Sequence, residues 1–399
     1  MSYKVAFISL GCAKNLVNSE QMLSLISKAG HRIISEPENA DAVIINTCGF
    51  IESAKSEAIE NILEMAQLKW AGKLRKIIVA GCLAQRYKEE ILAELPEVDA
   101  LVGVGSYGEI VQVLEEAMAG EGTPCRFGDK SAPVDELDRI VSTGPGWAYI
   151  KIAEGCDNCC AYCVIPFIRG RFRSRPMENI VREAEDLARR GVKELIVVAQ
   201  DITRYGVDLY GKRSLPELLS RLCRIPGLHW IRLHYLYPDE IDEELISVIA
   251  GEPKILKYLD IPIQHINNGI LRKMNRRGTG DEIRGLFKTL RRRIPGLVLR
   301  TSLIVGLPGE GEEEFQELCE FLREVRIERA GVFVFSPEEG TPAAAMPDQV
   351  DREIAERRAE LVMELQSAIM DEFNASRIGQ TLEVLCEGYD GELEYWYGR

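Results

Sequence analysis

The first part of the chain alternates short, nearly continuous apolar runs with longer stretches whose apolar residues recur every three or four positions. The short runs are typical of strands that are buried on both faces, and the periodic stretches are typical of amphipathic helices. This alternation predicts an α/β domain over residues 1–125, a doubly wound parallel sheet with helices on both faces. The expected strands cover 4–10, 41–47, 76–81 and 100–105, and the expected helices cover 19–30, 52–70, 88–95 and 109–120.

Residues 126–146 have a different composition, rich in Gly, Pro, Ser and Asp, which is typical of a linker. From Trp147 the alternation resumes and continues to about residue 375. Six strand–helix units predict a closed or nearly closed (βα)6 barrel, a partial form of the eight-unit TIM barrel, with its chemistry at the carboxyl ends of the strands. The expected strands cover 148–154, 194–200, 230–236, 258–264, 299–306 and 331–336, and a long helix is expected over 351–373.

The last stretch, residues 376–399, changes to short alternating β patterns. About two dozen residues are too few to fold alone. We therefore expect either the truncated start of a small β module or a piece that packs on the barrel. Acidic side chains dominate this stretch: Glu383, Glu387, Asp390, Glu392 and Glu394.

The composition, with 46% hydrophobic and 28% charged residues, is that of a globular protein, and no apolar run reaches the roughly 18–20 residues that span a bilayer. We expect a cytoplasmic protein without membrane association, in which thiols stay reduced. The chain nevertheless contains 11 cysteines. An odd number argues against a complete disulfide set and favours metal or cluster ligation.

The net charge of −14 argues against a general nucleic-acid-binding protein. Two basic stretches, around 169–175 and 272–300, depart from this acidic average. They are either solvated helix faces or a rim that meets an RNA-rich or acidic partner.

Three cysteines of the first domain, Cys12, Cys48 and Cys82, each follow a predicted strand directly. Because the carboxyl ends of parallel strands lie at one edge of a sheet, these thiols should converge. A glycine beside each one would let the backbone approach a bulky cofactor. Three thiolates suit either zinc with an open position or an iron–sulfur cluster with one exposed iron, and the first domain alone leaves both open.

A second set lies in GCDNCCAYCVIP, residues 155–166, directly after the first predicted barrel strand. Structural zinc sites usually combine two separated C-x2-C pairs, and this domain has no second pair. Three ligands on one short loop suit a cubane cluster with a free iron. Because Cys159 lies among Cys156, Cys160 and Cys163, spacing alone leaves the choice of ligands open.

The C-x3-C-x2-C motif on the first loop of a predicted (βα)6 barrel resembles the signature of the radical S-adenosylmethionine (SAM) enzymes, including the aromatic Tyr162. This resemblance implies that Cys156, Cys160 and Cys163 bind a [4Fe–4S] cluster whose free iron chelates SAM. On this pattern Cys159 is not a ligand.

The stretches SLGCAKN, NTCGF, AGCLAQR, RGRFRSRP and VAQD extend the likeness, so the whole chain resembles the methylthiotransferases. This implies a first [4Fe–4S] cluster on Cys12, Cys48 and Cys82 beside the SAM-binding one. It also implies an N-terminal methylthiotransferase domain (1–125), a linker (126–146), a radical SAM barrel (147–375) and the start of a TRAM-like domain (376–399).

Within this family, SLGCAKNLVNSE, YLDIPIQHINNGILRKMNRR and FSPEEGTPAA resemble the branch that modifies an aspartate of small-subunit ribosomal protein twelve. An acidic tail agrees with a basic protein partner. The alternative branch acts on prenylated adenosine in tRNA and usually has serine-rich residues where this chain has 264–267. A more remote alternative is a non-enzymatic iron–sulfur carrier.

The resemblance also implies the chemistry and the partners. The SAM-bound cluster, supplied by a one-electron reductant, generates a 5′-deoxyadenosyl radical that removes hydrogen from the aspartate β-carbon. The first cluster holds sulfur from a sulfur donor, and a second SAM supplies the methyl group. We assign no catalytic side chain beyond the cluster ligands, and we expect a monomer that meets nucleic acid only in a ribosomal context.

Other candidate site residues lie at the ends of the barrel strands. Gln200 and Asp201 could contact SAM or form an ordinary helix-entry cap, and the segment from Ser302 to Gly306 could line the adenine of SAM or be a plain core strand. Gln264 and His265 could face the substrate, although a lone histidine is more often structural. We interpret the remaining cysteines as packing or incidental thiols: Cys125, Cys223, Cys319 and Cys386.

Overall fold

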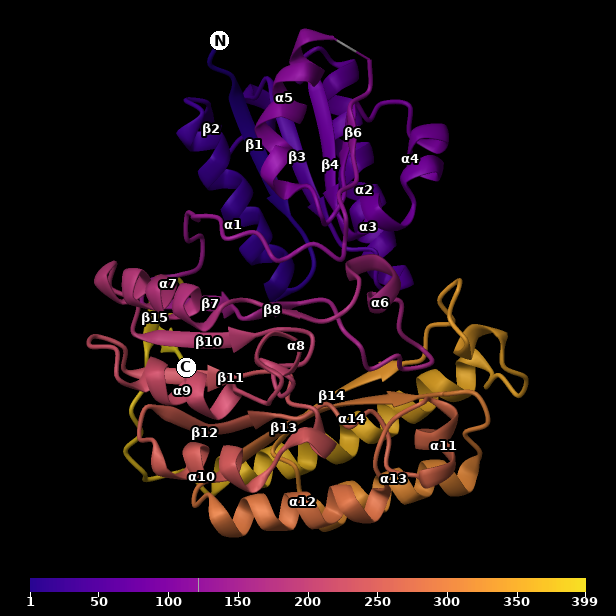
Figure 1. Ribbon diagram of the computed structural model, residues 1–399. Helices are drawn as coiled ribbons and strands as arrows, with labels where there is room; N and C mark the ends of the chain where they lie inside the picture. The colour runs from indigo at the N-terminus through magenta and orange to yellow at the C-terminus, as the bar shows by residue number, and fades with distance from the viewer. Residues whose placement is uncertain (121) are drawn as a thin grey trace. The chain divides into compact units, whose positions relative to one another are not determined.

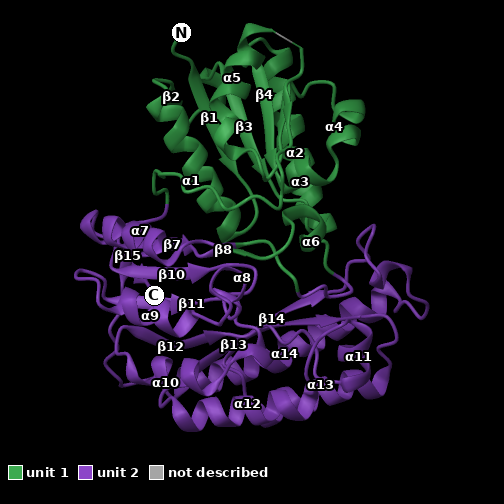
Figure 2. Cartoon of the chain, viewed as in Figure 1, with its two compact units in different colours: residues 1–142, 154–157, 163–173 green, residues 143–153, 158–162, 174–399 purple. Residues whose placement is uncertain are grey.

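The computed structural model describes residues 1–120 and 122–399 (Figure 1). It forms two compact units (Figure 2). Unit 1 contains residues 1–142, 154–157 and 163–173, and unit 2 contains residues 143–153, 158–162 and 174–399. Glu121, inside the predicted first domain, lies outside the described residues. Among the described helices, none is both long enough and apolar enough to cross a membrane.

Unit 1 contains a parallel sheet of six strands in the order β2-β1-β3-β4-β5-β6. The chain therefore changes direction across the sheet between β1 and β3, and ligands of doubly wound folds bind at the carboxyl ends of strands at such a point. The strands are β1 (Lys4–Ser9), β2 (Arg32–Ile34), β3 (Ala42–Thr47), β4 (Lys76–Gly81), β5 (Ala100–Val102) and β6 (Cys125–Arg126).

Helices cover both faces of this sheet. One apolar cluster joins the sheet to α1 and α5, and a second joins it to α2, α3 and α4. This confirms the doubly wound arrangement that the alternating pattern predicted. The helices of unit 1 are α1 (Ala13–Lys28), α2 (Glu52–Trp70), α3 (Cys82–Arg86), α4 (Lys88–Glu94), α5 (Ile110–Ala119) and α6 (Ile165–Arg169), with 3-10 turns at Pro37–Asn39 and Tyr107–Glu109.

Unit 2 contains a second parallel sheet of six strands in the order β14-β13-β12-β11-β10-β7. Each of these strands pairs with the strand of the preceding or following strand–helix repeat. Within the described residues, β7 and β14 are the two edge strands. The sheet is therefore a partial barrel, as expected. Its strands are β7 (Trp147–Lys151), β10 (Glu194–Val198), β11 (Trp230–Leu233), β12 (Ile255–Asp260), β13 (Val298–Val305) and β14 (Arg329–Val334). The short strands β8 (Ala153–Glu154) and β9 (Arg173–Ser174) lie where the chain passes between units.

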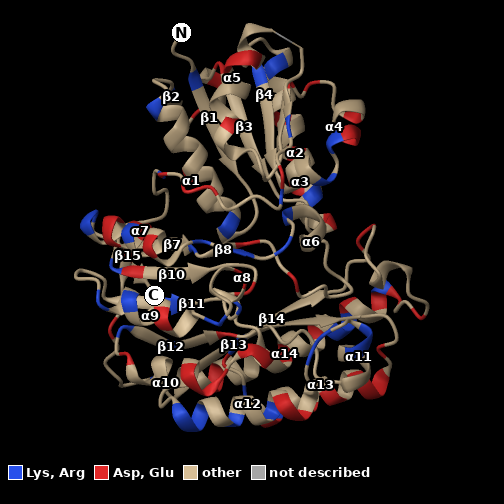
Figure 3. Cartoon of the chain, viewed as in Figure 1, with Lys and Arg blue, Asp and Glu red and all other residues tan. Residues whose placement is uncertain are grey.

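The crossover helices of unit 2 pack side by side in chain order, from α7 through α9, α10, α12 and α13 to α14. Lys, Arg, Asp and Glu residues are frequent along α12 and α13 (Figure 3). The helices are α7 (Met177–Arg189), α8 (Val207–Tyr210), α9 (Leu215–Cys223), α10 (Glu243–Gly251), α11 (Asn268–Lys273), α12 (Gly280–Arg293), α13 (Glu312–Val325) and α14 (Arg352–Ala375), with 3-10 turns at Pro238–Glu240 and Ala343–Ala345.

The acidic tail forms an antiparallel hairpin of β15 (Cys386–Asp390) and β16 (Tyr395–Gly398). It is attached to the barrel by Arg399, whose guanidinium lies 4.0 Å from the centre of the Trp147 ring. His229 and Glu383 add a contact of 2.9 Å between Nε2 and Oε1. The tail therefore packs on the barrel, which was one of the two expected outcomes.

Helix α1 and strand β12 show the largest differences from the sequence-based prediction. Helix α1 begins at Ala13 instead of residue 19, because its first turns carry buried polar residues that hide the apolar period. Strand β12 covers Ile255–Asp260 instead of 258–264. The regular ladder is interrupted there because Pro262 has no backbone N–H, and pairing with β13 resumes only as an isolated bridge between Gln264, which has a φ of 71°, and Leu303. The structure also adds β2 and α3, which the pattern did not predict.

Candidate functional site

Cys12, Cys48 and Cys82 gather at the carboxyl edge of the sheet in unit 1. Strand β1 ends at Ser9, β3 ends at Thr47 and β4 ends at Gly81, so each thiol follows its strand within a few residues. A Cβ atom at Gly11 would lie 2.9 Å from the Cβ of Cys48 and 3.4 Å from its sulfur. The loops that carry these cysteines are therefore in direct contact, as the sheet topology predicted.

Glycines make this close approach possible. Gly11 has a φ of 87°, a left-handed conformation in which a side chain is strained. At Gly49 a Cβ atom would lie 2.8 Å from the Cα of Leu83, next to Cys82. Larger residues at these positions would separate the cysteine loops, so the backbone is shaped to bring the three thiols together.

A buried polar network fixes the loop and the helix between the cysteines. Asn15, in the first turn of α1, donates to the carbonyl oxygen of Leu10 across 2.7 Å. Asn46, at the end of β3, donates to the carbonyl oxygen of Asn15 across 2.9 Å and to the hydroxyl of Ser19 across 2.8 Å. These bonds satisfy polar groups that would be costly to bury alone.

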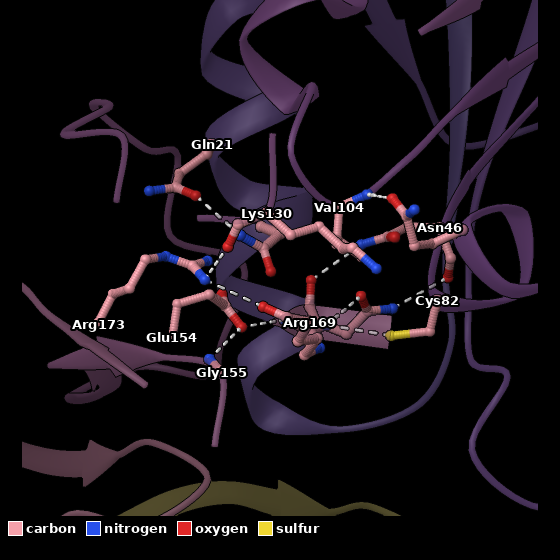
Figure 4. Close-up of polar contacts among 12 residues, drawn as sticks. Gln21, Asn46, Cys82, Val104, Lys130, Glu154, Gly155, Arg169 and Arg173 are labelled. Carbon is pink, nitrogen blue, oxygen red and sulfur yellow. Dashed lines mark hydrogen bonds and ion pairs between the residues drawn. The ribbon is translucent and has the colours of Figure 1, made fainter. Parts of the chain in front are cut away.

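Arg169, at the end of α6, contacts the cysteine site directly (Figure 4). Its Nη2 lies 3.3 Å from the sulfur of Cys82 and 3.3 Å from Oδ1 of Asn15. Its Nη1 donates to Oε1 of Glu154 across 2.7 Å. Although burial opposes its charge, Cys82 and Glu154 hold the pKa of Arg169 well above its usual value, so the guanidinium stays charged.

The three thiols have different electrostatic surroundings. Burial, followed by the nearby Cys82, raises the pKa of Cys48 to about 11. Burial also raises the pKa of Cys82, with Arg169 opposing it. At Cys12 burial is outweighed by the charges of Lys14 and Arg169, and the pKa is lowered. The thiolate is the form of cysteine that binds a metal. The positive charges of Lys14 and Arg169 therefore favour the ligating form of Cys12.

These residues fit an iron–sulfur cluster better than a zinc ion. A single zinc needs every sulfur about 2.3 Å from one point. In the described part of the chain, no three His, Cys, Asp or Glu side chains are arranged to hold one ion. The cysteines of a cubane bind different irons and stand farther apart. The buried hydroxyl of Tyr107 has no hydrogen-bond partner among the described residues. Burial raises the pKa of this hydroxyl, while Arg169 opposes the rise and Cys82 adds to it.

The cysteines of the second set divide between the units: Cys156 and Cys163 belong to unit 1, whereas Cys159 and Cys160 belong to unit 2. In unit 1 the backbone N–H of Cys156 donates to the carbonyl oxygen of Gly170 across 3.1 Å. The sulfur of Cys163 lies 3.5 Å from the backbone nitrogen of Ile165. Cys156 and Cys163 thus both contact the segment 165–170, which contains Arg169.

In unit 2, Cys159 and Cys160 have opposite environments. Cys160 is buried, and its sulfur lies 3.7 Å from the hydroxyl of Tyr237 and 3.7 Å from Nη1 of Arg276. Cys159 is exposed, has a φ of 47° and accepts a bond to its carbonyl oxygen from Asn275. The backbone therefore turns sharply between two adjacent thiols, and only one of them is enclosed by polar partners.

Asp201 follows β10 and connects it to the cysteine loop. Its carboxylate accepts from the backbone N–H of Thr203 across 3.0 Å and from Nδ2 of Asn158 across 2.8 Å. Burial raises the pKa of Asp201, and the bonds from Thr203 and Asn158 oppose that rise. The side chain thus holds the loop of Cys160. The adjacent Gln200 is half-buried.

Ser302 lies within β13 and Gly306 follows its last residue, while Gln264 and His265 lie beyond the end of the neighbouring β12. Gln264 donates its backbone N–H to the carbonyl oxygen of Ser302 across 2.9 Å. A Cβ atom at Gly306 would lie 2.4 Å from the Cβ of Ala355 on α14, so packing alone requires glycine there. His265 is 1% exposed and its Nδ1 accepts the backbone N–H of Asn267 across 3.0 Å, whereas its Nε2, 3.5 Å from Oε2 of Glu310, makes no hydrogen bond within the described residues.

The basic stretches are mostly paired inside their units. Arg291 contacts Glu328 across 2.7 Å, and Arg293 contacts Glu243 across 2.6 Å. Arg175 contacts Glu183 across 2.7 Å. These pairs favour charged helix faces over a free basic rim.

Comparisons with known proteins cover both parts of the chain. Residues 4–103 match the family model described as "Uncharacterized protein family UPF0004", and residues 150–322 match the Radical SAM superfamily. "Ribosomal protein uS12 methylthiotransferase RimO" of Acetivibrio thermocellus is 51% identical over 406 residues, covering 100% of this chain and 89% of that protein. The protein of the same name from Desulforamulus reducens is 52% identical over 384 residues, covering 96% and 86%.

The chain belongs to the RimO family. Its fold is shared with solved radical SAM enzymes. TsrM, a radical SAM methyltransferase from Kitasatospora setae solved with cobalamin and a [4Fe–4S] cluster, aligns with a TM-score of 0.63 at 16% identity, over 86% of this chain and 74% of that one. OxsB, a cobalamin-dependent radical SAM enzyme, aligns with a TM-score of 0.56 at 11% identity, over 99% and 64%. Both likenesses concern the fold alone, and the predicted α/β fold with a radical SAM domain is confirmed.

Several polar residues of this RimO family member were not assigned a role from the sequence. Arg169 and Arg276 were included only among the basic stretches, and Asn15 and Tyr107 were not singled out. One signal was present for Arg169: the apolar flank VIPFI makes a buried position plausible for the arginine that follows. The contacts with Cys82 and Cys160 required the structure, because they join residues far apart in sequence.

Proposed function

We propose that this chain is a radical SAM methylthiotransferase that inserts a methylthio group at the β-carbon of an aspartate in ribosomal protein uS12. The main support is identity of about half with RimO proteins over the full length, together with a second set of three thiols outside the radical SAM motif. The proposed reaction consumes two SAM molecules and needs a sulfur donor and a one-electron reductant.

Two [4Fe–4S] clusters are proposed. Cys12, Cys48 and Cys82 would hold the first, and Cys156, Cys160 and Cys163 would hold the second. When bound, the clusters and SAM supply the one-electron chemistry and the transferred sulfur, which no protein side chain can supply. The chain's own residues hold the ligands in place.

Four positions are proposed to contact SAM: Gln200, Asp201, Ser302 and Gly306. Asp201 would act by holding the loop of Cys160 through Asn158, as its hydrogen bond supports. Gln264 and His265 are proposed for the substrate side. Gln264 is the better supported of the two, because its φ of 71° is a strained conformation of the kind that clusters at functional sites.

We also propose the functional division into 1–125, 126–146, 147–375 and 376–399, with the last segment as the start of a TRAM-like domain. Its carboxylates, including Glu387 and Asp390, suit contact with a basic ribosomal protein. A monomer in the cytoplasm is the simplest arrangement for this reaction.

The deciding experiment is mass analysis of two substrates after anaerobic turnover. The reconstituted protein, SAM, sulfide and reductant are incubated with uS12 in one arm and with tRNA carrying prenylated adenosine in the other. A methylthio group on an aspartate of uS12, absent with a Cys160→Ala variant, is expected. Modified tRNA with unmodified uS12 would instead establish the tRNA activity. Absence of 5′-deoxyadenosine in both arms would favour an iron–sulfur carrier.

A further inference from the structure

Arg169 divides its contacts between a sulfur and a carboxylate. Its Nη2 lies 3.3 Å from the sulfur of Cys82, whereas its Nη1 lies 2.7 Å from Oε1 of Glu154 (Figure 4). The side chain of Arg169 is 1% exposed and that of Glu154 is 9% exposed. The site thus contains a buried guanidinium. One of its nitrogens contacts the proposed cluster ligand Cys82, and the other binds its counter-ion, Glu154.

Packing fixes this arrangement. Val164 and Ile168, on and beside α6, form an apolar cluster with Cys82, so the helix cannot move without exposing them. Gly155 has a φ of 76°, and a Cβ atom there would lie 2.0 Å from the carbonyl oxygen of Arg171. The strand of Glu154 can therefore lie against the segment of Arg169 only because residue 155 is glycine.

Burial of this ion pair is costly, since each buried charge loses its hydration. The contact with the sulfur of Cys82 indicates a function for this buried charge. Adding an electron to a cluster adds negative charge, and a guanidinium that donates to a ligand sulfur stabilises that charge. Hydrogen bonds to sulfur and the local charge set cluster potentials, and screening is weak where water is excluded.

We propose that Arg169 is a positioning residue that acts through the Cys82 sulfur to raise the reduction potential of the first cluster, and that Glu154 limits this rise. The inference rests on the proposed function, because it requires a cluster on the first-domain cysteines. It goes beyond that function by assigning a role to two residues that ligate nothing.

The test measures the potential of the first cluster alone. The full chain is prepared with its other cluster removed by the substitutions Cys156→Ala, Cys160→Ala and Cys163→Ala. Redox titration of the one-electron couple is followed by the electron paramagnetic resonance signal of the reduced cluster. Arg169→Gln should lower the potential by about 59 mV or more, a tenfold change in the reduced-to-oxidised ratio. Glu154→Gln should raise it, because the guanidinium loses its counter-ion.

The reduction potential of the double variant Arg169→Gln, Glu154→Gln should lie between those of the parent and Arg169→Gln. The potential of Arg169→Lys should stay near that of the parent, because lysine keeps the charge. Arg171→Gln is the matched control: it removes an exposed arginine of the same segment and should leave the potential unchanged. If Arg169→Gln loses its cluster, the direction of the shift in Glu154→Gln still tests the proposal, with Arg169→Lys as the charge-preserving reference.

The outcomes separate this inference from the proposed function. About four irons per chain with the same potential in all variants would overturn the role of Arg169 and leave the cluster assignment intact. A preparation that binds no iron would overturn the first cluster and this inference with it. Ordered shifts of opposite sign for Arg169→Gln and Glu154→Gln would support the proposal, because a purely structural role predicts no such order.

Discussion

The guanidinium of Arg276 lies 4.1 Å from the centre of the Tyr237 ring, while its Nη1 lies 3.7 Å from the sulfur of Cys160. Its Nη2 also donates to the carbonyl oxygen of Pro262 across 2.6 Å. The planar, branched head group of arginine makes all three contacts at once, which the single ammonium of lysine cannot do. Arg276 therefore holds the sulfur of the proposed ligand Cys160 in place against Tyr237.

We expect Arg276→Lys to weaken the second cluster even though it keeps the charge. Loss of a partner that orients a metal ligand typically costs about 10–100-fold in metal affinity or activity. The measurement is iron content after anaerobic reconstitution, together with the rate of 5′-deoxyadenosine formation from SAM. Arg272→Lys, at an exposed position on α11, is the control and should match the parent. Equal iron retention in both variants would show that the stacked geometry is dispensable.

Substitution of the adjacent cysteines should give opposite results. Cys159 is exposed, so Cys159→Ala should retain iron and SAM cleavage. Cys160 is buried beside Tyr237 and Arg276, so Cys160→Ala should lose SAM cleavage and the second cluster. Cys159→Gly is a useful third variant, because glycine adopts a φ of 47° without strain and should preserve stability. The prediction fails if Cys159→Ala loses iron while Cys160→Ala keeps it.

The sequence predicted what depends on regular periodicity. Helix α2 was expected at 52–70 and occupies Glu52–Trp70, because a long amphipathic pattern is decided locally. Helix α1 was expected to start too late, because its first turns bury Asn15 and Asn18 for contacts that come from other parts of the chain. The positions of Cys12, Cys48 and Cys82 followed from parallel-sheet topology alone. The contacts of Arg169 with Glu154 and Cys82 did not, because these partners are 15 and 87 residues away in sequence.

Removing one partner of the buried ion pair between Glu20 and Arg139 should strongly destabilise unit 1. Its atoms lie 2.5 Å apart, with side chains 1% and 4% exposed, and it ties the linker to α1. We expect Arg139→Met to lower the free energy of unfolding by about 3–5 kcal/mol, since the remaining carboxylate is buried without its counter-ion. Thermal unfolding of the cluster-free protein measures this change.

The same helix and linker provide a matched control in the pair of Lys28 and Asp138, whose side chains are 60% and 76% exposed. Because exposed pairs contribute little, Lys28→Met should change stability by less than about 1 kcal/mol. The double variant Glu20→Leu, Arg139→Met should recover part of the loss, because no unpaired charge remains. Similar losses for Arg139→Met and Lys28→Met would contradict the importance of burial.

Iron content should report the two clusters separately. After anaerobic reconstitution we expect about eight irons per chain, because each cubane contains four. The variant Cys12→Ala, Cys48→Ala, Cys82→Ala should bind about four and should still form 5′-deoxyadenosine, since the second site keeps its ligands. Cys125→Ala, which removes a half-buried thiol of the same unit, is the control and should keep about eight. About four irons per chain in both the parent and the triple variant would contradict the proposal of a first cluster.

Gly306 and Gly296 allow the cost of a left-handed backbone to be separated from the cost of a steric clash. Both have positive φ, 78° and 74°, so alanine at either position is strained by about 1–2 kcal/mol. At Gly296 nothing lies within 4 Å of an added Cβ, whereas at Gly306 the Cβ of Ala355 lies 2.4 Å away. Gly306→Ala should therefore cost about 1–3 kcal/mol more than Gly296→Ala, through displacement of α14. Ala355→Gly should recover part of that excess in thermal unfolding, because it removes the clashing atom. Equal losses for the two glycine variants, or no recovery with Ala355→Gly, would show that α14 does not require glycine at residue 306.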